Sequence, residues 1–183
     1  ALVGDASHCI GKETKVIDAQ GMYVAPGMLD GHIHIESSML CPGEYARAVV
    51  PHGTTGIYYD PHEICNVLGF EGVELMVKDA ERTPLKAMLT VPSCVPAVPG
   101  FENNGATITS SDISHQMKMG EVVGLGEMMN FPGVLNGDEE VLRKLKLARD
   151  YNLPIDGHAP LLSGKELDKY LEQYIITDHE CSN

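Results

Sequence analysis

Basic residues are scarce in this sequence of 183 residues. It holds 13 lysines and arginines against 26 aspartates and glutamates, which gives a formal net charge of -13 at pH 7. No basic patch interleaved with aromatic side chains occurs along the chain. The charge and this pattern argue against a nucleic-acid backbone as the partner, because phosphates are bound by clustered Lys and Arg.

Membrane segments and cysteine-based scaffolds are missing as well. No apolar run is long enough to span a bilayer, and the first residues lack the basic and apolar regions of a signal peptide. The five cysteines are scattered without a C-x-x-C pair, which argues against a disulfide framework or a structural zinc ribbon. We therefore expect no membrane partner and a location in the reducing cytoplasm.

Several short catalytic motifs are absent too. The chain has no G-x-S-x-G nucleophile turn and no G-x-x-x-x-G-K-[ST] phosphate loop, and "GLGEMM" departs from G-x-G-x-x-G after its second glycine. "PHEIC" is not followed by the second histidine of H-E-x-x-H, and the P-C-x-x-C element of cytidine deaminases does not occur. The chain therefore lacks the motifs of serine hydrolases, phosphate-loop and dinucleotide-binding proteins, H-E-x-x-H zinc proteases and cytidine deaminases.

Short runs of Val, Ile and Leu alternate along the chain with segments of helical period. The runs predict strands over 28–35, 55–60, 86–92, 122–128, 153–158 and 174–178. Such alternation is typical of βα units around a parallel sheet, either doubly wound or part of a (β/α)8 barrel. A complete barrel needs about 250 residues, so a barrel here would be partial, with about six βα units.

Residues 1–25 differ in character from the rest. They are rich in glycine, and "KVIDAQGMYVAPG" predicts two small strands joined at Gly21 and ended by Pro26-Gly27. We therefore expect a short separate piece over 1–25 and an α/β domain over 26–183.

Metal-capable side chains follow the predicted strands. In "MLDGHIHIES", His32 and His34 are two apart, so a strand points both to one face. The later strand ends carry Asp60, His62, Glu63, Glu127, His158, Asp178, His179 and Glu180. The carboxyl ends of barrel strands form the active site in (β/α)8 enzymes, so these side chains are expected to meet.

Four imidazoles and one carboxylate are a suitable ligand set for two divalent first-row ions. The expected ligands are His32, His34, Glu127, His158 and His179, with Glu127 bridging the two ions. Ligand type alone admits manganese, iron(II) and zinc equally. The cluster of Asp60, His62 and Glu63 either caps the following helix or contacts the substrate.

The blocks "APGMLDGHIHIESSM", "DPHEI", "GEMMN" and "DGHAP" resemble, in order and spacing, the adenine deaminases of the amidohydrolase superfamily. The resemblance implies a metal-dependent barrel over 26–183, flanked by a small β-sandwich of which residues 1–25 are a remnant. It implies the same five metal ligands and favours manganese or iron(II). The superfamily's Asp at the end of the eighth strand has no counterpart, so we expect an N-terminal to central fragment that could be inactive alone.

The resemblance implies hydrolytic deamination of adenine to hypoxanthine and ammonia by a metal-activated hydroxide. Glu36, His62 and Glu63 are the expected catalytic side chains, with the two carboxyls as candidate proton relays. Two alternatives stay open. One is a dihydroorotase-like hydrolase of cyclic amides, although those often bridge their metals with a carboxylated lysine where this chain has Glu127. The other is an inactive metal-binding fragment. Unpaired outer strands also predict a homo-oligomer.

Overall fold

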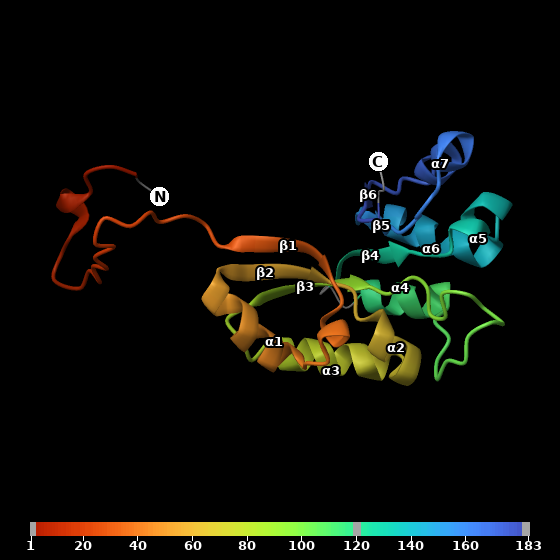
Figure 1. The fold of residues 1–183 in the computed structure, drawn as a ribbon, viewed down its shortest axis with the longest axis horizontal. Coiled ribbons are helices and arrows are strands. Elements are labelled where there is room, and N and C mark those ends of the chain that lie inside the picture. The colour runs from red at the N-terminus through yellow and green to blue at the C-terminus, as the bar shows by residue number, and fades with distance from the viewer. Residues whose placement is uncertain (1–2, 119–121, 181–183) are drawn as a thin grey trace.

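The computed structural model describes residues 3–118 and 122–180, and its centre is one parallel sheet (Figure 1). Six strands of this region pair in chain order: β1 (Met28–Ile33), β2 (Thr54–Tyr59), β3 (Lys86–Val91), β4 (Val122–Met128), β5 (Ile155–Gly157) and β6 (Thr177–Asp178). The sheet curls into a half-barrel, so the partial (β/α)8 fold predicted from the sequence is confirmed.

Helices connect the strands, as expected for βα units. They are α1 (Pro42–Val49), α2 (His62–Leu68), α3 (Phe70–Ala80), α4 (Ser110–Lys118), α5 (Phe131–Asn136), α6 (Glu139–Asp150) and α7 (Gly164–Leu171). Short 3-10 turns occupy Ser7–Cys9, Ile35–Ser38 and Val50–His52. In Figure 1, α1 and α3 lie along one face of β1, β2 and β3. None of the helices in the described ranges is long and apolar enough to span a bilayer.

The sequence of α6 explains its limits. Asp138 caps the helix by accepting hydrogen bonds from the backbone N–H groups of Glu140 and Val141, which satisfies two amides that a helix start leaves open. Val141, Leu145 and Ala148 recur on one face and are buried. The helix therefore packs its apolar stripe inward together with Lys144, whose ammonium donates to the Ser93 carbonyl at 2.9 Å, while its other charged residues are partly or fully exposed.

The core lies between the sheet and its helices. Ile57, Leu125 and Ile155 from the strands are at most 1% exposed, and they share one cluster with Val73 and Leu145 from the helices. Burying each such side chain contributes about 1.5–3 kcal/mol to folding. The packing of this core thus holds the ends of the strands in place, and the polar residues of the chain follow these ends.

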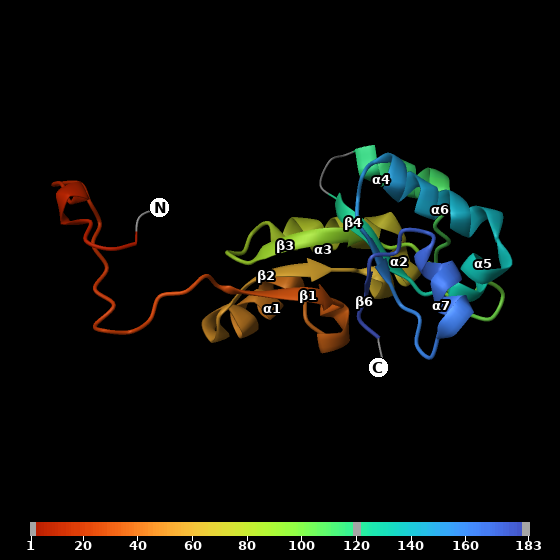
Figure 2. The ribbon, with the colours of Figure 1, turned by 90° about the horizontal axis from the view of Figure 1, so that it is seen from above.

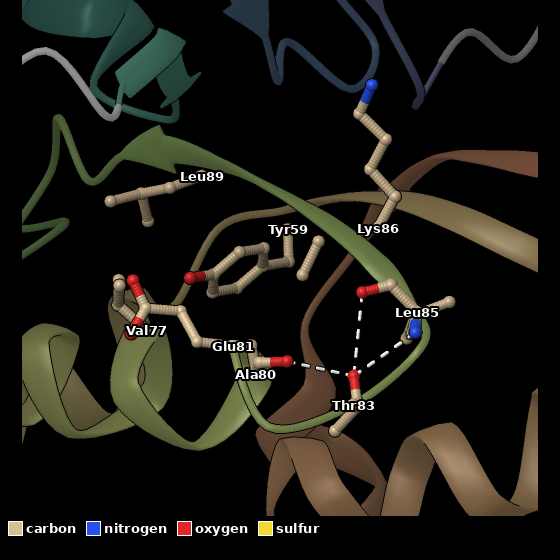
Figure 3. A pocket seen from close by; sticks show the side chains of 9 residues that line it. Tyr59, Val77, Ala80, Glu81, Thr83, Leu85, Lys86 and Leu89 are labelled. Atoms are coloured by element: carbon tan, nitrogen blue, oxygen red, sulfur yellow. Dashed lines mark hydrogen bonds between the residues drawn. The ribbon is translucent and has the colours of Figure 1, made fainter.

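A cavity of about 420 Å³ lies between α3 and β3 (Figure 3). Thr83 closes the loop beneath it by donating to the Ala80 carbonyl at 2.8 Å and accepting from the Leu85 N–H at 3.2 Å. Tyr59 and Leu89 form part of the apolar wall. No histidine or cysteine lines this cavity, so it offers none of the expected metal ligands.

Residues 3–27 form an exposed arm that projects from the sheet (Figure 1 and Figure 2). The expected turn at Gly21 is present, where the Met22 N–H bonds to the Ala19 carbonyl at 2.8 Å. The two short strands expected around it do not form within the described part of the arm. A strand needs a neighbour for its backbone groups, and the arm has none beside it. Its membership of a β-sandwich stays a prediction.

The last two strands are shorter than the sequence predicted. β5 covers three residues of the expected 153–158, and β6 covers two of the expected 174–178. Tyr174 has a φ of 65°, a left-handed conformation that cannot continue a strand. The segment of helical period between β3 and β4 forms α4 over Ser110–Lys118 within the described ranges.

The outer strands leave backbone groups without a sheet partner. In the described residues β1 pairs with β2 alone and β6 pairs with β5 alone. Residues 1–183, expressed alone, should therefore associate, because exposed edges recruit other chains. Light scattering measures this, and Met28→Lys, which places a charge at the 69% exposed start of β1, should reduce the associated fraction. A monodisperse monomer that is stable on heating would contradict the prediction.

Candidate metal centre

The five predicted ligands come from the carboxyl ends of four strands. His32 and His34 lie at the end of β1, Glu127 is the second-last residue of β4, and His158 and His179 directly follow β5 and β6. The β4–β5 pairing shifts register between Leu125 and Met128, which places Glu127 at an irregularity. Such bulges redirect side chains, and here the Glu127 carboxylate reaches the histidines.

Glu127 lies at the centre of the cluster and is 2% exposed. Its Oε1 is 3.1 Å from His34 Nε2, while its Oε2 is 2.7 Å from His158 Nδ1 and 3.1 Å from His179 Nε2. The two carboxylate oxygens therefore face different histidines. All of them border an open depression of about 670 Å³, which His32 also lines.

His32 and His34 turn their outer nitrogens toward each other. His32 Nδ1 lies 2.7 Å from a carboxylate oxygen of Asp156, and His34 Nδ1 lies 2.8 Å from the Asp60 carbonyl. With both Nδ1 protons engaged, two Nε2 lone pairs meet at 3.0 Å. Such an approach is favourable only with a cation between them, either a proton or a metal ion.

Asp156 was missed by the sequence analysis. Besides His32, its Oδ2 lies 3.5 Å from His179 Nδ1, and its Oδ1 accepts the Thr177 hydroxyl at 2.6 Å. A carboxylate behind a ligand histidine fixes the tautomer and ring orientation. The available signal was "DGH", in which Asp156 shares a strand face with His158.

The pKa values reflect the same cluster. Burial by itself would raise the pKa of Glu127, but the hydrogen bond with His34 and the neighbouring His158 bring it below its ordinary value. Burial alone would lower the pKa of His34, yet its bonds to Glu127 and to the Asp60 carbonyl raise it to about 9. The cluster favours positive charge between its donors, as a cation site does.

The donor atoms fit two metal ions. His32, His34 and Glu127 form one group of ligand atoms within 4.8 Å of one another, and Glu127, His158 and His179 form a second. Glu127 Oε2 is buried and has no hydrogen bond of acceptable geometry among the described residues, although two imidazole nitrogens are near. An uncompensated buried carboxylate oxygen surrounded by imidazoles suits a cation.

Comparison with known families places the chain in one of them. Residues 23–183 match the family model described as "Amidohydrolase family". The chain belongs to the amidohydrolase family. That family generally binds divalent metals, and the donor groups described above could hold them.

Curated relatives of this amidohydrolase bear the name adenine deaminase. One from Clostridium botulinum (strain ATCC 19397 / Type A) is 56% identical over the whole chain, which covers 31% of that relative. One from Methanothermobacter thermautotrophicus is 56% identical over 86% of the chain and 29% of its own length. One from Clostridium acetobutylicum is 50% identical over the whole chain and 32% of its own length. The chain thus spans about a third of the length of these curated relatives.

The three predicted catalytic residues of the amidohydrolase occupy different places. His62 lines the depression, and its Nδ1 lies 3.5 Å from Glu127 Oε1 and 3.7 Å from Asp60 Oδ1. Glu36 accepts the Ile64 N–H at 3.1 Å at the start of α2, and Glu63 accepts the hydroxyl of Ser37. The two carboxyls therefore hold the wall of the depression and do not line it.

Asp60 is a further buried residue of this region, 1% exposed. Its Oδ2 accepts the Glu127 N–H at 3.1 Å, so the residue after β2 fixes the backbone of β4. A Cβ added at Gly126 would lie 2.3 Å from this oxygen. Glycine is required at position 126 because the Asp60 carboxylate passes where a side chain would be.

Proposed function

We propose that this chain supplies the metal centre of an adenine deaminase, and that the whole protein hydrolyses adenine to hypoxanthine and ammonia. The observation that carries the proposal is the single buried Glu127 carboxylate with imidazole nitrogens of His34, His158 and His179 within 3.1 Å. The names of the curated relatives support adenine as the substrate.

Each ion would have its own set of donors. His32 Nε2, His34 Nε2 and Glu127 Oε1 would hold the first ion, and Glu127 Oε2, His158 Nδ1 and His179 Nε2 would hold the second. Manganese or iron(II) is the proposed metal, and zinc suits the same ligand types. When bound, such ions supply a water activated for attack on C6 of adenine.

Proton movement is assigned to His62, Glu36 and Glu63. His62 lies between the carboxylates of Asp60 and Glu127; burial would lower its pKa, but these two carboxylates raise it. Burial raises the pKa of Glu36, and the charge of Glu63 adds to the rise, which brings Glu36 nearer to the range useful for general acid catalysis. We propose that His62, which lines the depression, moves protons to the ring and to the leaving amino group, and that Glu36 and Glu63 relay protons from behind its wall.

The proposal extends to the setting of the enzyme. Adenine is the proposed small-molecule partner, with no nucleic-acid or membrane partner. The net charge of -13 is consistent with the absence of a nucleic-acid partner. A homo-oligomer in the cytoplasm is the proposed working form of the whole protein.

An assay on the full-length protein tests this function. Loaded with Mn²⁺, it should bind close to two ions per chain and release hypoxanthine and ammonia from adenine in equal amounts. Removal of the ions with a chelator should abolish turnover, and Mn²⁺ should restore it. Hydrolysis of dihydroorotate without any adenine turnover would replace the proposal by the cyclic-amide alternative. Two bound ions with neither activity would favour a non-catalytic metal-binding protein.

A further inference from the structure

The strand ends that carry Glu127 and His158 are joined by a side chain. After the register shift of β4 against β5, the phenol of Tyr170 lies between them. Its hydroxyl donates to the Met128 carbonyl at 2.9 Å and accepts the His158 N–H at 3.1 Å. One hydroxyl therefore links the residue after Glu127 to the backbone of His158.

Tyr170 is built into this position. It comes from α7, the helix that follows β5, and is 0% exposed. A Cβ added at Gly157 would lie 3.0 Å from the hydroxyl, so glycine at this position leaves the space that the phenol enters.

We propose that Tyr170 is a positioning residue for the second metal ion of the proposed centre. It sets the separation between Glu127 and His158, whose Oε2 and Nδ1 atoms lie 2.7 Å apart. This role rests on the proposed function, since it concerns donors to an ion of that site. The Tyr170 hydroxyl bonds to the backbone next to Glu127 and at His158, whereas His32 and His34 are oriented by Asp156 and by the Asp60 carbonyl.

The consequence is an asymmetry between the two ions. Loss of the Tyr170 hydroxyl leaves the Met128 carbonyl and the His158 N–H unpaired in a buried place, so β4 and β5 move relative to each other. Glu127 Oε2 and His158 Nδ1 then lose their fixed separation. The first ion keeps His32 and His34 of β1, which the hydroxyl does not hold, and shares only Glu127 with the second ion.

Tyr170→Phe in the full-length protein tests the role, because it removes only the hydroxyl. Titration of the metal-free protein with Mn²⁺ should give wild-type affinity at one site and about 10–100-fold weaker affinity at the other. The spin-coupled Mn²⁺ pair signal in electron paramagnetic resonance should fall in parallel. Turnover should be reduced at low Mn²⁺ and recover as Mn²⁺ is raised.

Two controls separate positioning from general stability. Tyr151→Phe removes a hydroxyl at the 38% exposed end of α6 and should leave both affinities unchanged. Val73→Ala in α3 creates a distant core defect and should lower the melting temperature without changing either affinity. Two equally tight ions in Tyr170→Phe, beside two in wild type, overturn the positioning role alone. A wild-type protein that binds fewer than two ions overturns the proposed function, and the positioning role with it.

Discussion

Glu127→Gln should remove at least one of the two ions and reduce adenine turnover by about 100-fold or more. Glutamine keeps the size of the side chain and one oxygen, but it carries no charge and replaces the second oxygen by a donor. That donor would face either His34, whose Nε2 lies 3.1 Å from Glu127 Oε1, or His158 and His179, whose nitrogens lie 2.7 and 3.1 Å from Glu127 Oε2. In either orientation, one ion loses a charged donor and meets an amide N–H instead.

Metal content and turnover are to be measured on the same sample of the full-length variant. Glu139→Gln is the matched control, because the Glu139 side chain is 84% exposed on α6 and its charge is solvated. A Glu127 that merely accepts hydrogen bonds near a strand end would lose about 1 kcal/mol of stability and leave activity intact. A Glu127→Gln variant with both ions and near wild-type turnover would therefore reject the bridging role.

Much of the fold could be predicted because the apolar pattern is local. Runs such as 86–92 and 122–128 contain the β-branched and aliphatic residues that a buried parallel strand requires, and they became β3 and β4. The arm and the ends of β5 and β6 could not be predicted in this way. Strand formation in these segments depends on which other strands lie beside them, and a short stretch of sequence does not show that.

Some residues of the candidate site could be predicted from the sequence and others could not. His32, His34, Glu127, His158 and His179 could be named because metal chemistry restricts which residue types serve and strand order brings their ends together. The supporting residues Asp156 and Tyr170 were not predicted. An Asp inside a strand and a Tyr inside a helix have many ordinary roles. Their contacts with His32 and His158 depend on how β5 and α7 pack.

Asp156→Asn should weaken binding of the first ion about 10–100-fold, although Asp156 donates nothing to that ion in the proposed arrangement. Asp156 Oδ2 accepts from His32 Nδ1 at 2.7 Å, while Oδ1 accepts from the Thr177 hydroxyl at 2.6 Å and from the Gly157 N–H at 3.0 Å. The carboxylate thus accepts on both oxygens. Asparagine can accept on one side only.

Either orientation of asparagine leaves a donor facing a donor. With its oxygen toward His32, its NH₂ meets the Gly157 N–H; with its NH₂ toward His32, it removes the acceptor that holds the His32 proton on Nδ1. The His32 proton then moves to Nε2, the atom needed for the ion. Titration of the metal-free variant with Mn²⁺ measures the loss of affinity, and nitrogen NMR of the zinc-loaded or metal-free protein reports the tautomer of His32.

Asp150→Asn is the matched control, because Asp150 is 52% exposed and pairs with Lys146 on the surface of α6. Unchanged Mn²⁺ affinity and an Nδ1-protonated His32 in Asp156→Asn would show that Asp156 does not orient the ligand.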